Sequence, residues 1–187
     1  MTRKTPSADG RARALLLLDF QYDFLSEQGR MPVARHQVAD VIAAANAAIA
    51  EARGAGIAVV AIGNEFRASD WFMNLLRRNA AIAGSRGAAW DDRVGIESAA
   101  YFSKSRGDAF SNPDLTDFLA QQNTGEVVLT GLYASACVTA TARGALARGL
   151  SVRVLKAAVA DSSDRRREAA LARLSRLGVL VSAGLAG

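Results

Sequence analysis

The sequence predicts an α/β fold, with a parallel sheet of about six strands and helices on both faces of that sheet. Two observations support this prediction. Short apolar runs alternate along the chain with longer segments of helical periodicity. The apolar runs have no polar face, which is typical of strands that helices cover on both sides. Regular alternation of this kind favours a parallel sheet between two helical layers.

The first half of the chain contains three predicted strands and two predicted helices. The first strand is a continuous apolar run that stops at Asp19. The alanine-rich first helix stops at Gly54 and Gly56, because glycine readily adopts the left-handed conformation that ends helices. In order, the predicted elements are a strand at 12–18, a helix at 37–53, a strand at 57–62, a helix at 70–83 and a strand at 99–103.

The second half continues the alternation with three more helices and three more strands. Pro113 stands at the first position of the next helix, where its missing N–H costs nothing. Gly149 and Gly178 follow the later two helices as end signals. In order, these elements are a helix at 113–122, a strand at 126–130, a helix at 135–148, a strand at 151–155, a helix at 164–177 and a strand at 179–181.

Length and composition suit one intracellular domain. The 187 residues are half hydrophobic and include three prolines, so we expect a single domain at 11–187 after a flexible tail at 1–10. A single cysteine cannot form an intramolecular disulfide and indicates a reducing compartment, so we expect a cytoplasmic protein. The apolar run at 14–18 is too short for a signal peptide or a membrane span, so no membrane partner is expected.

The net charge of +5 raises the question of nucleic-acid binding. The basic residues are spread along the chain, and the one dense cluster, 165–167, opens a predicted helix. No aromatic residues are interleaved with that cluster, which favours a solvated surface over a nucleic-acid site. We therefore expect no nucleic-acid partner. A homo-oligomer, either a dimer or a tetramer, is also expected.

Three chemically different side chains follow three of the predicted strands. Asp19 ends the first strand, Lys104 follows the strand at 99–103, and Cys137 begins the helix that follows the strand at 126–130. Ligands of parallel sheets bind beyond the carboxyl ends of the strands, so these residues could share one site. A carboxylate can accept a thiol proton and return it to a leaving amine, and an ammonium stabilises the negative charge that develops.

Each of these residues also has an ordinary structural interpretation. An aspartate at a strand end is often a cap or a surface carboxylate, and a lone cysteine is often a small buried hydrophobe. A lysine is most often a solvated surface charge. Spacing alone therefore leaves both interpretations open.

Three segments resemble the motifs of isochorismatase-like hydrolases. The segment LLLLDFQYDF resembles the opening strand of that superfamily with its D-x-Q-x-D-F motif. The segment FSKSRGDAFSNPDLTDFL resembles the lysine motif, and VVLTGLYASACVTATARGALARG resembles the nucleophile motif. The motifs occur in the family's order and spacing, and the similarity extends over about 13–181.

The resemblance implies a Rossmann-like three-layer sandwich with a catalytic triad of Asp19, Lys104 and Cys137. Most members of the superfamily cleave an amide, ureido or imide bond through a thioester. No cofactor is expected for this chain. They also carry a cis peptide bond ahead of the nucleophile loop, which here would join Leu132 to Tyr133. The backbone N–H groups of Tyr133 and Cys137 would then form an oxyanion hole.

The chain also departs from its family pattern. Nicotinamidases of the superfamily bind a metal through an Asp and two His after the second strand, where this chain has GNEFRASDW. The only histidine, His36, is expected at a surface or helix entry, so no metal site is predicted. The family's acidic residue two positions before the cysteine is Ser135 here. True isochorismatases cleave a vinyl ether without a cysteine nucleophile, so the presence of Cys137 argues against that activity.

Four residues are predicted to contact the substrate: Phe24, Asn64, Glu65 and Phe110. Core packing is an equal alternative for the two aromatic rings. Glu65 would favour a substrate with amide N–H groups or a positive charge, although a surface or ion-paired glutamate is an alternative. The sequence thus predicts a cysteine amidohydrolase that acts on non-peptide C–N bonds of small molecules. The competing interpretation is a catalytically idle binding or oligomerisation module on the same fold.

Overall fold

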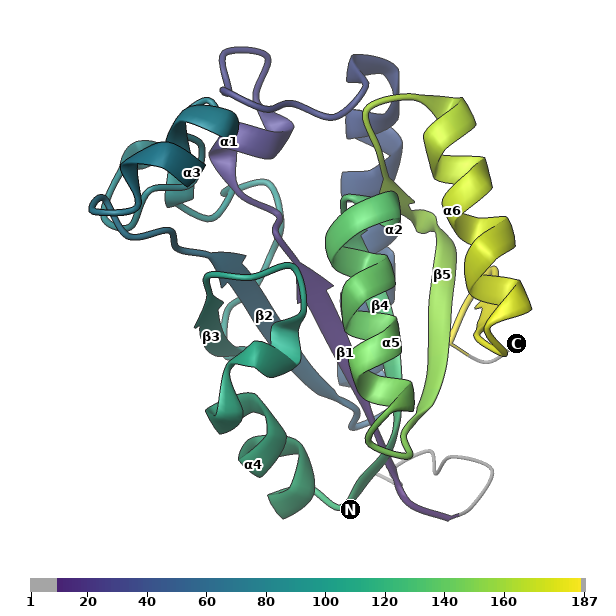
Figure 1. The fold of residues 1–187 in the computed structure, drawn as a ribbon. Helices are drawn as coiled ribbons and strands as arrows, with labels where there is room; N and C mark the ends of the chain where they lie inside the picture. Colours follow the sequence, from purple (N-terminus) through teal and green to yellow (C-terminus); the bar gives the residue numbers. More distant parts are fainter. Residues whose placement is uncertain (1–9, 186–187) are drawn as a thin grey trace.

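The computed structural model describes residues 10–185, so the predicted tail at 1–10 lies outside the described residues except for Gly10. Six strands form one parallel sheet in the order β3-β2-β1-β4-β5-β6, which confirms the predicted fold class (Figure 1). The strands are β1 (Ala12–Leu18), β2 (Ala58–Asn64), β3 (Ala100–Lys104), β4 (Thr124–Leu132), β5 (Ser151–Ala160) and β6 (Leu180–Ser182).

Helices cover both faces of the sheet, and the sheet separates the core into two clusters. One cluster lies under α2 (Arg35–Gly54) and includes Leu15 and Leu17 of β1. The other includes Leu16 and Leu18 and lies under α4 (Pro113–Gln121), α5 (Thr139–Leu146) and α6 (Asp164–Arg176). Alternate residues of a strand point to opposite faces of the sheet. Because helices cover both faces, all four leucines are fully buried. The strand therefore has no polar face, as its sequence predicted.

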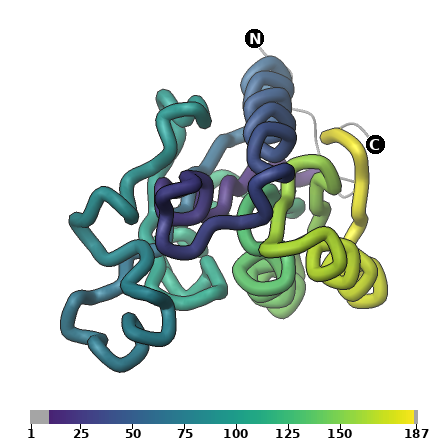
Figure 2. Tube along the Cα trace, turned by 90° about the horizontal axis from the view of Figure 1, so that it is seen from above, coloured from purple at the N-terminus to yellow at the C-terminus, as the bar shows by residue number. Residues whose placement is uncertain are grey.

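Several short elements connect the layers. They are the helices α1 (Tyr22–Leu25) and α3 (Trp71–Leu76), the 3₁₀ turns Arg86–Ala88 and Ala109–Ser111, and a π-helical turn at Ala134–Val138 directly before α5. Figure 2, which views the molecule from above, shows the segment between β2 and β3 extending away from the sheet. None of the helices within residues 10–185 is both long enough and apolar enough to cross a membrane.

The helix predicted at 70–83 is the clearest error in the predicted elements, because α3 ends at Leu76. Arg78, Asn79 and Ala81 have φ values of 54°, 58° and 51°, which a right-handed helix does not allow. Ala81 then donates its N–H to the buried carboxylate of Asp23 at 2.9 Å. This long-range contact pulls the chain back to the core, which ends the helix early.

The strand order creates a topological switch between β1 and β4. From β1 the chain builds outward through β2 and β3, whereas β4 begins on the other side of β1 and continues to β5 and β6. Connections that leave in opposite directions open a crevice at the carboxyl ends of the two central strands. Asp19 follows β1, and the loop that carries Cys137 follows β4.

Candidate active site

The strand register brings Asp19, Lys104 and Cys137 to one place. Leu18, the residue before Asp19, pairs with both Ile62 of β2 and Gly131 of β4. On the outer side, Asn64 of β2 pairs with Lys104 of β3. The carboxyl ends of four neighbouring strands thus lie at one edge of the sheet. Their side chains can meet there although the residues are far apart in the sequence.

The predicted convergence of the three side chains is confirmed. The Nζ atom of Lys104 donates to Oδ2 of Asp19 at 2.9 Å and lies 3.4 Å from the sulfur of Cys137. The side chains of Lys104 and Asp19 are almost fully buried, and the Cys137 residue is half-buried. The other carboxylate oxygen, Oδ1 of Asp19, has no hydrogen-bond partner within residues 10–185. The thiol lies beside this carboxylate, which leaves an acceptor available for its proton.

The backbone around Asp19 is held in a conformation that few residues adopt. The φ angle of Asp19 is +61°, in the left-handed region, which costs of order 1–3 kcal/mol for a residue other than glycine. Beside it, Gly131 has a φ of +127°, and a Cβ there would lie 2.1 Å from the carbonyl oxygen of Leu18. Only glycine allows β4 to approach β1 this closely at the strand ends. Such strain is typical of functional sites.

Cys137 lies in the π-helical turn at Ala134–Val138, directly before α5. The peptide bond between Leu132 and Tyr133 is cis, as predicted. The phenol of Tyr133 donates to the carbonyl oxygen of Met31, and the Phe24 ring packs edge-on against Tyr133 at a centroid distance of 5.9 Å. These contacts anchor the loop that carries Cys137 to the segment that follows β1.

Burial and the neighbouring charges set the protonation states of the three groups. Burial raises the pKa of Asp19 and outweighs the opposing effect of Lys104. Burial alone would lower the pKa of Lys104, but Asp19 and Cys137 outweigh it, so the pKa lies above its usual value. Burial and the Asp19 carboxylate raise the pKa of Cys137 to about 12. At neutral pH the thiol is therefore neutral, and it lies beside the buried contact between Lys104 and Asp19.

Asn64, predicted as a substrate contact, belongs to the hydrogen-bond network of the thiol. Its Oδ1 accepts from Lys104 at 2.8 Å, and its Nδ2 lies 3.9 Å from the sulfur of Cys137. Gln21 holds Asn64 in place, because its Oε1 accepts from the Asn64 N–H and its Nε2 donates to the Asn64 carbonyl, both at 2.8 Å. Sequence reasoning assigned Gln21 no role, although its place in the D-x-Q motif is the signal that could have found it.

Asp161 is a second residue that sequence reasoning missed. It follows β5 and is 1 % exposed. Its carboxylate accepts the backbone N–H of Ser135 and that of Ser162, each at 2.7 Å. Its own backbone N–H donates to Oε1 of Gln37, which ties this loop to α2. A carboxylate directly after β5 therefore holds the loop that carries Cys137 at Ser135, the position where the family resemblance implied an acidic side chain.

The other three predicted substrate contacts lie in different surroundings. Glu65 is half-buried, accepts from the phenol of Tyr101 at 2.8 Å and lines a polar cavity of about 290 Å³ beside Lys104. Phe24 is buried in the core against Tyr133. Phe110 is buried in the core cluster under α4, α5 and α6, and its ring packs 4.8 Å from the guanidinium of Arg148, beyond the C-terminal end of α5. Its contact with a substrate stays a prediction.

The residues after β2 do not fit the metal site of the nicotinamidases. Within residues 10–185 no group of three His, Cys, Asp or Glu side chains is arranged to hold a metal ion. Glu65 bonds to Tyr101, and Arg67 lines the same cavity with a positive charge that repels cations. His36 lies on the surface as the second residue of α2, as predicted, and its Nε2 lies 2.8 Å from Asp164.

The family assignment follows from the match of residues 13–184 to the family described as the isochorismatase domain. The chain belongs to the isochorismatase family of hydrolases. An isochorismatase-like hydrolase from Alkaliphilus metalliredigens is 25% identical, with a TM-score of 0.84 over 91% of this chain and 94% of that chain. An N-carbamoylsarcosine amidase from Thermoplasma acidophilum is 25% identical, with a TM-score of 0.78 over 91% and 95%.

A streptothricin hydrolase from Streptomyces noursei is also similar to this chain. It is 28% identical over 152 residues, which cover 80% of this chain and 54% of the relative. The chain thus spans about half the length of that curated relative.

Proposed function

We propose that this chain is a cysteine-dependent hydrolase that cleaves a C–N bond of a small amide, ureido compound or imide through a thioester. The observation that carries the proposal is the position of Lys104. Its ammonium lies 2.9 Å from the carboxylate of Asp19 and 3.4 Å from the sulfur of Cys137 in a buried site. A base, a cation and a nucleophile in mutual contact are the parts that acyl transfer requires.

The first step couples proton transfer to bond formation. Because the pKa of Cys137 is raised to about 12, the thiol does not ionise by itself at neutral pH. Asp19 accepts the proton as the sulfur adds to the carbonyl carbon, and the C=O π electrons move to the carbonyl oxygen. The raised pKa of Asp19 makes its carboxylate a stronger base than an exposed aspartate. Lys104 stays charged and stabilises the negative charge on sulfur.

The later steps return the proton and release the products. The backbone N–H groups of Tyr133 and Cys137 are proposed to bind the oxyanion. Asp19 then donates its proton to the departing nitrogen, the C–N bond breaks, and a thioester remains on Cys137. Asp19 next removes a proton from a water molecule whose oxygen attacks the thioester. Cleavage of the C–S bond releases the acid, and the thiolate regains its proton.

The substrate class is proposed from the surroundings of the thiol and from the related proteins. Glu65 offers an acceptor to substrate N–H groups beside the site. Two of the relatives are named as an N-carbamoylsarcosine amidase and a streptothricin hydrolase. A test panel should therefore contain primary amides, N-carbamoyl amino acids, cyclic imides and lactams.

The experiment follows hydrolysis of this panel by ammonia release and by mass spectrometry of ring-opened products. We expect turnover by the wild-type chain and none by Cys137→Ala, with the same melting temperature for both. The matched control is Lys156→Met, since Lys156 is an exposed lysine of β5. Turnover by the alanine variant would refute the nucleophile. A folded wild-type chain that hydrolyses nothing and traps no acyl group on Cys137 would favour the idle binding module.

A further inference from the structure

The helix α3 has its polar and apolar sides reversed relative to a normal surface helix. Its one buried residue is Asn74, at 1 % exposure, whose Nδ2 donates to the carbonyl oxygen of Arg67 at 2.8 Å. The other five residues are large, apolar and exposed. Their exposed fractions are 73% for Trp71, 57% for Phe72, 43% for Met73, 64% for Leu75 and 64% for Leu76.

This exposed face, which we call the α3 patch (Trp71, Phe72, Met73, Leu75 and Leu76), is large enough to form the centre of an interface. An aromatic side chain can bury roughly 200 Å², so Trp71 and Phe72 alone expose about 260 Å². A stable interface buries about 800 Å² on each partner, and its core is rich in aromatic residues. The α3 patch thus supplies a large part of one side. Its place on the outer end of the segment between β2 and β3 leaves it accessible (Figures 1 and 2).

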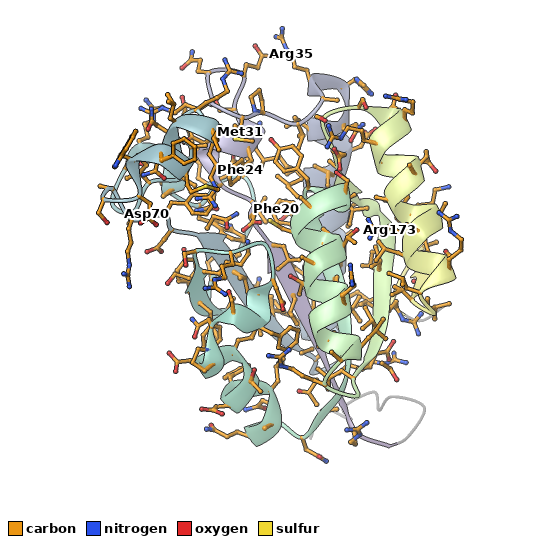
Figure 3. All side chains as sticks on the ribbon, viewed as in Figure 1. Phe20, Phe24, Met31, Arg35, Asp70 and Arg173 are labelled. Carbon is orange, nitrogen blue, oxygen red and sulfur yellow. The ribbon has the colours of Figure 1, made fainter. Side chains whose placement is uncertain are left out.

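Opposite charges stand at the two ends of the α3 patch. Asp70 precedes α3 and lies on the outside of the molecule (Figure 3), and Arg78 lies just beyond its C-terminal end. Both residues are exposed, and neither side chain has a hydrogen-bond or ion-pair partner within residues 10–185. The neighbouring Arg77 is already engaged, because its guanidinium stacks on the Phe66 ring at 4.0 Å from the ring centroid.

This arrangement is self-complementary about a twofold axis. Two copies of α3 packed antiparallel would place Asp70 of one copy against Arg78 of the other, twice. The six residues of α3 span about 9 Å of helix, so the two ion pairs would flank the paired apolar faces. A twofold interface uses the same surface on both subunits, which is what one helix with opposite charges at its ends provides.

We propose that the α3 patch is the contact surface between two copies of this chain, with Asp70 and Arg78 pairing across a twofold axis. An anionic membrane is the competing occupant. An anionic surface would offer Asp70 no cationic partner, whereas the dimer does.

The first test measures the molar mass of the full chain by light scattering after size-exclusion chromatography at tens of micromolar. We expect the wild type at twice the mass of the 187-residue chain, or at four times if a second interface exists. Leu75→Asp should halve that mass. The matched control, Leu177→Asp, replaces a leucine after α6 that is 41 % exposed and should leave the mass unchanged. A monomeric wild type, or a Leu75→Asp variant of unchanged mass, would overturn the proposal.

The second test exchanges the charges. Asp70→Arg places arginine against Arg78 of the partner, and Arg78→Asp places aspartate against Asp70, so each variant should dissociate at least tenfold more readily alone. An equimolar mixture should recover the dimer, because each variant then meets its complement. Recovery cannot be explained by misfolding of either variant. If the mixture stays monomeric, the proposed pairing is wrong. If a monomeric wild type binds vesicles of anionic phospholipid and Leu75→Asp abolishes that binding, the membrane is the occupant.

Discussion

Replacing Lys104 with methionine removes the buried charge that holds the candidate site together. At 2.9 Å, two unit charges attract by about 6 kcal/mol when the effective dielectric constant is about 20. The desolvation of both ions opposes this attraction, and removal of one partner from a buried pair typically costs 3–5 kcal/mol. We therefore expect Lys104→Met to lower the free energy of unfolding by about 3–5 kcal/mol at pH 7.5.

The same change should stop catalysis by raising the pKa of Asp19. Burial already raises that pKa, and Lys104 is the main group that lowers it. Without Lys104, Asp19 of the native state keeps a proton that the same residue of the unfolded chain releases near its ordinary pKa of 3.8. Stability then falls as the pH rises through the raised pKa, because the native state binds more protons than the unfolded state. The loss of stability should accordingly be larger at pH 8 than at pH 5.

The loss of activity can also be scaled from the structure. At 3.4 Å the ammonium stabilises a charge on sulfur by about 5 kcal/mol at the same dielectric constant. Each 1.36 kcal/mol corresponds to a factor of ten, so kcat/KM should fall by about 10³ or more. Lys104→Arg should be nearly as damaging, because a planar guanidinium cannot replace a compact ammonium in a closed site.

Urea denaturation at both pH values and the rate of hydrolysis measure these effects. Lys156→Met is the control for loss of a lysine, because Lys156 is exposed on β5. A Lys104→Met variant with kcat/KM within tenfold of the wild type would refute the role given to the ammonium. Equal stability losses at pH 5 and pH 8 would refute the argument for the proton on Asp19.

Four further outcomes follow from the site. Replacement of Cys137 with alanine should abolish hydrolysis and leave circular dichroism and the melting temperature nearly unchanged, since the thiol is half-buried and small. In the wild type, kcat/KM should decline on the acid side with a pKa above the ordinary aspartate value of 3.8, because Asp19 must be ionised to accept the proton. A pH–rate profile measures this pKa. The Asp161→Asn variant has one acceptor oxygen for the two backbone N–H groups of Ser135 and Ser162. This change should lower kcat by about tenfold and slow the alkylation of Cys137. If both rates are unchanged, the loop needs no such anchor. Finally, activity should survive dialysis against a chelator, and an enzyme that loses activity and regains it with zinc would contradict the account of the site.

Much of the site could be predicted because its chemistry lies at strand ends that the sequence marks. Asp19 interrupts an apolar run, and the family motifs identify Lys104 and Cys137. Their convergence then follows from the parallel sheet, in which all carboxyl ends lie at one edge. Asn64 was placed near the substrate, but its contacts with Lys104 and the sulfur could not be foreseen. They depend on the register between β2 and β3, which hydrophobic periodicity does not specify.

The predictions that failed or were missing concern contacts between distant segments. The helix predicted at 70–83 ends at Leu76 because Asp23, 58 residues before Ala81, accepts the backbone N–H of Ala81. The ring of Phe110 packs against Arg148, a contact that the sequence did not reveal. In each case the local sequence allows more than one conformation, and packing against another element selects between them.

The sequence by itself therefore determined the order and type of the elements, the α/β class and the identity of the three central side chains. These depend on local periodicity and on motifs, which are properties of neighbouring residues. The tertiary structure alone decided that Asp161 anchors the loop that carries Cys137, that Gln21 fixes Asn64, and that α3 turns its apolar side chains outward. Such features depend on which side chains of remote segments meet, and that is settled only when the chain packs into one core.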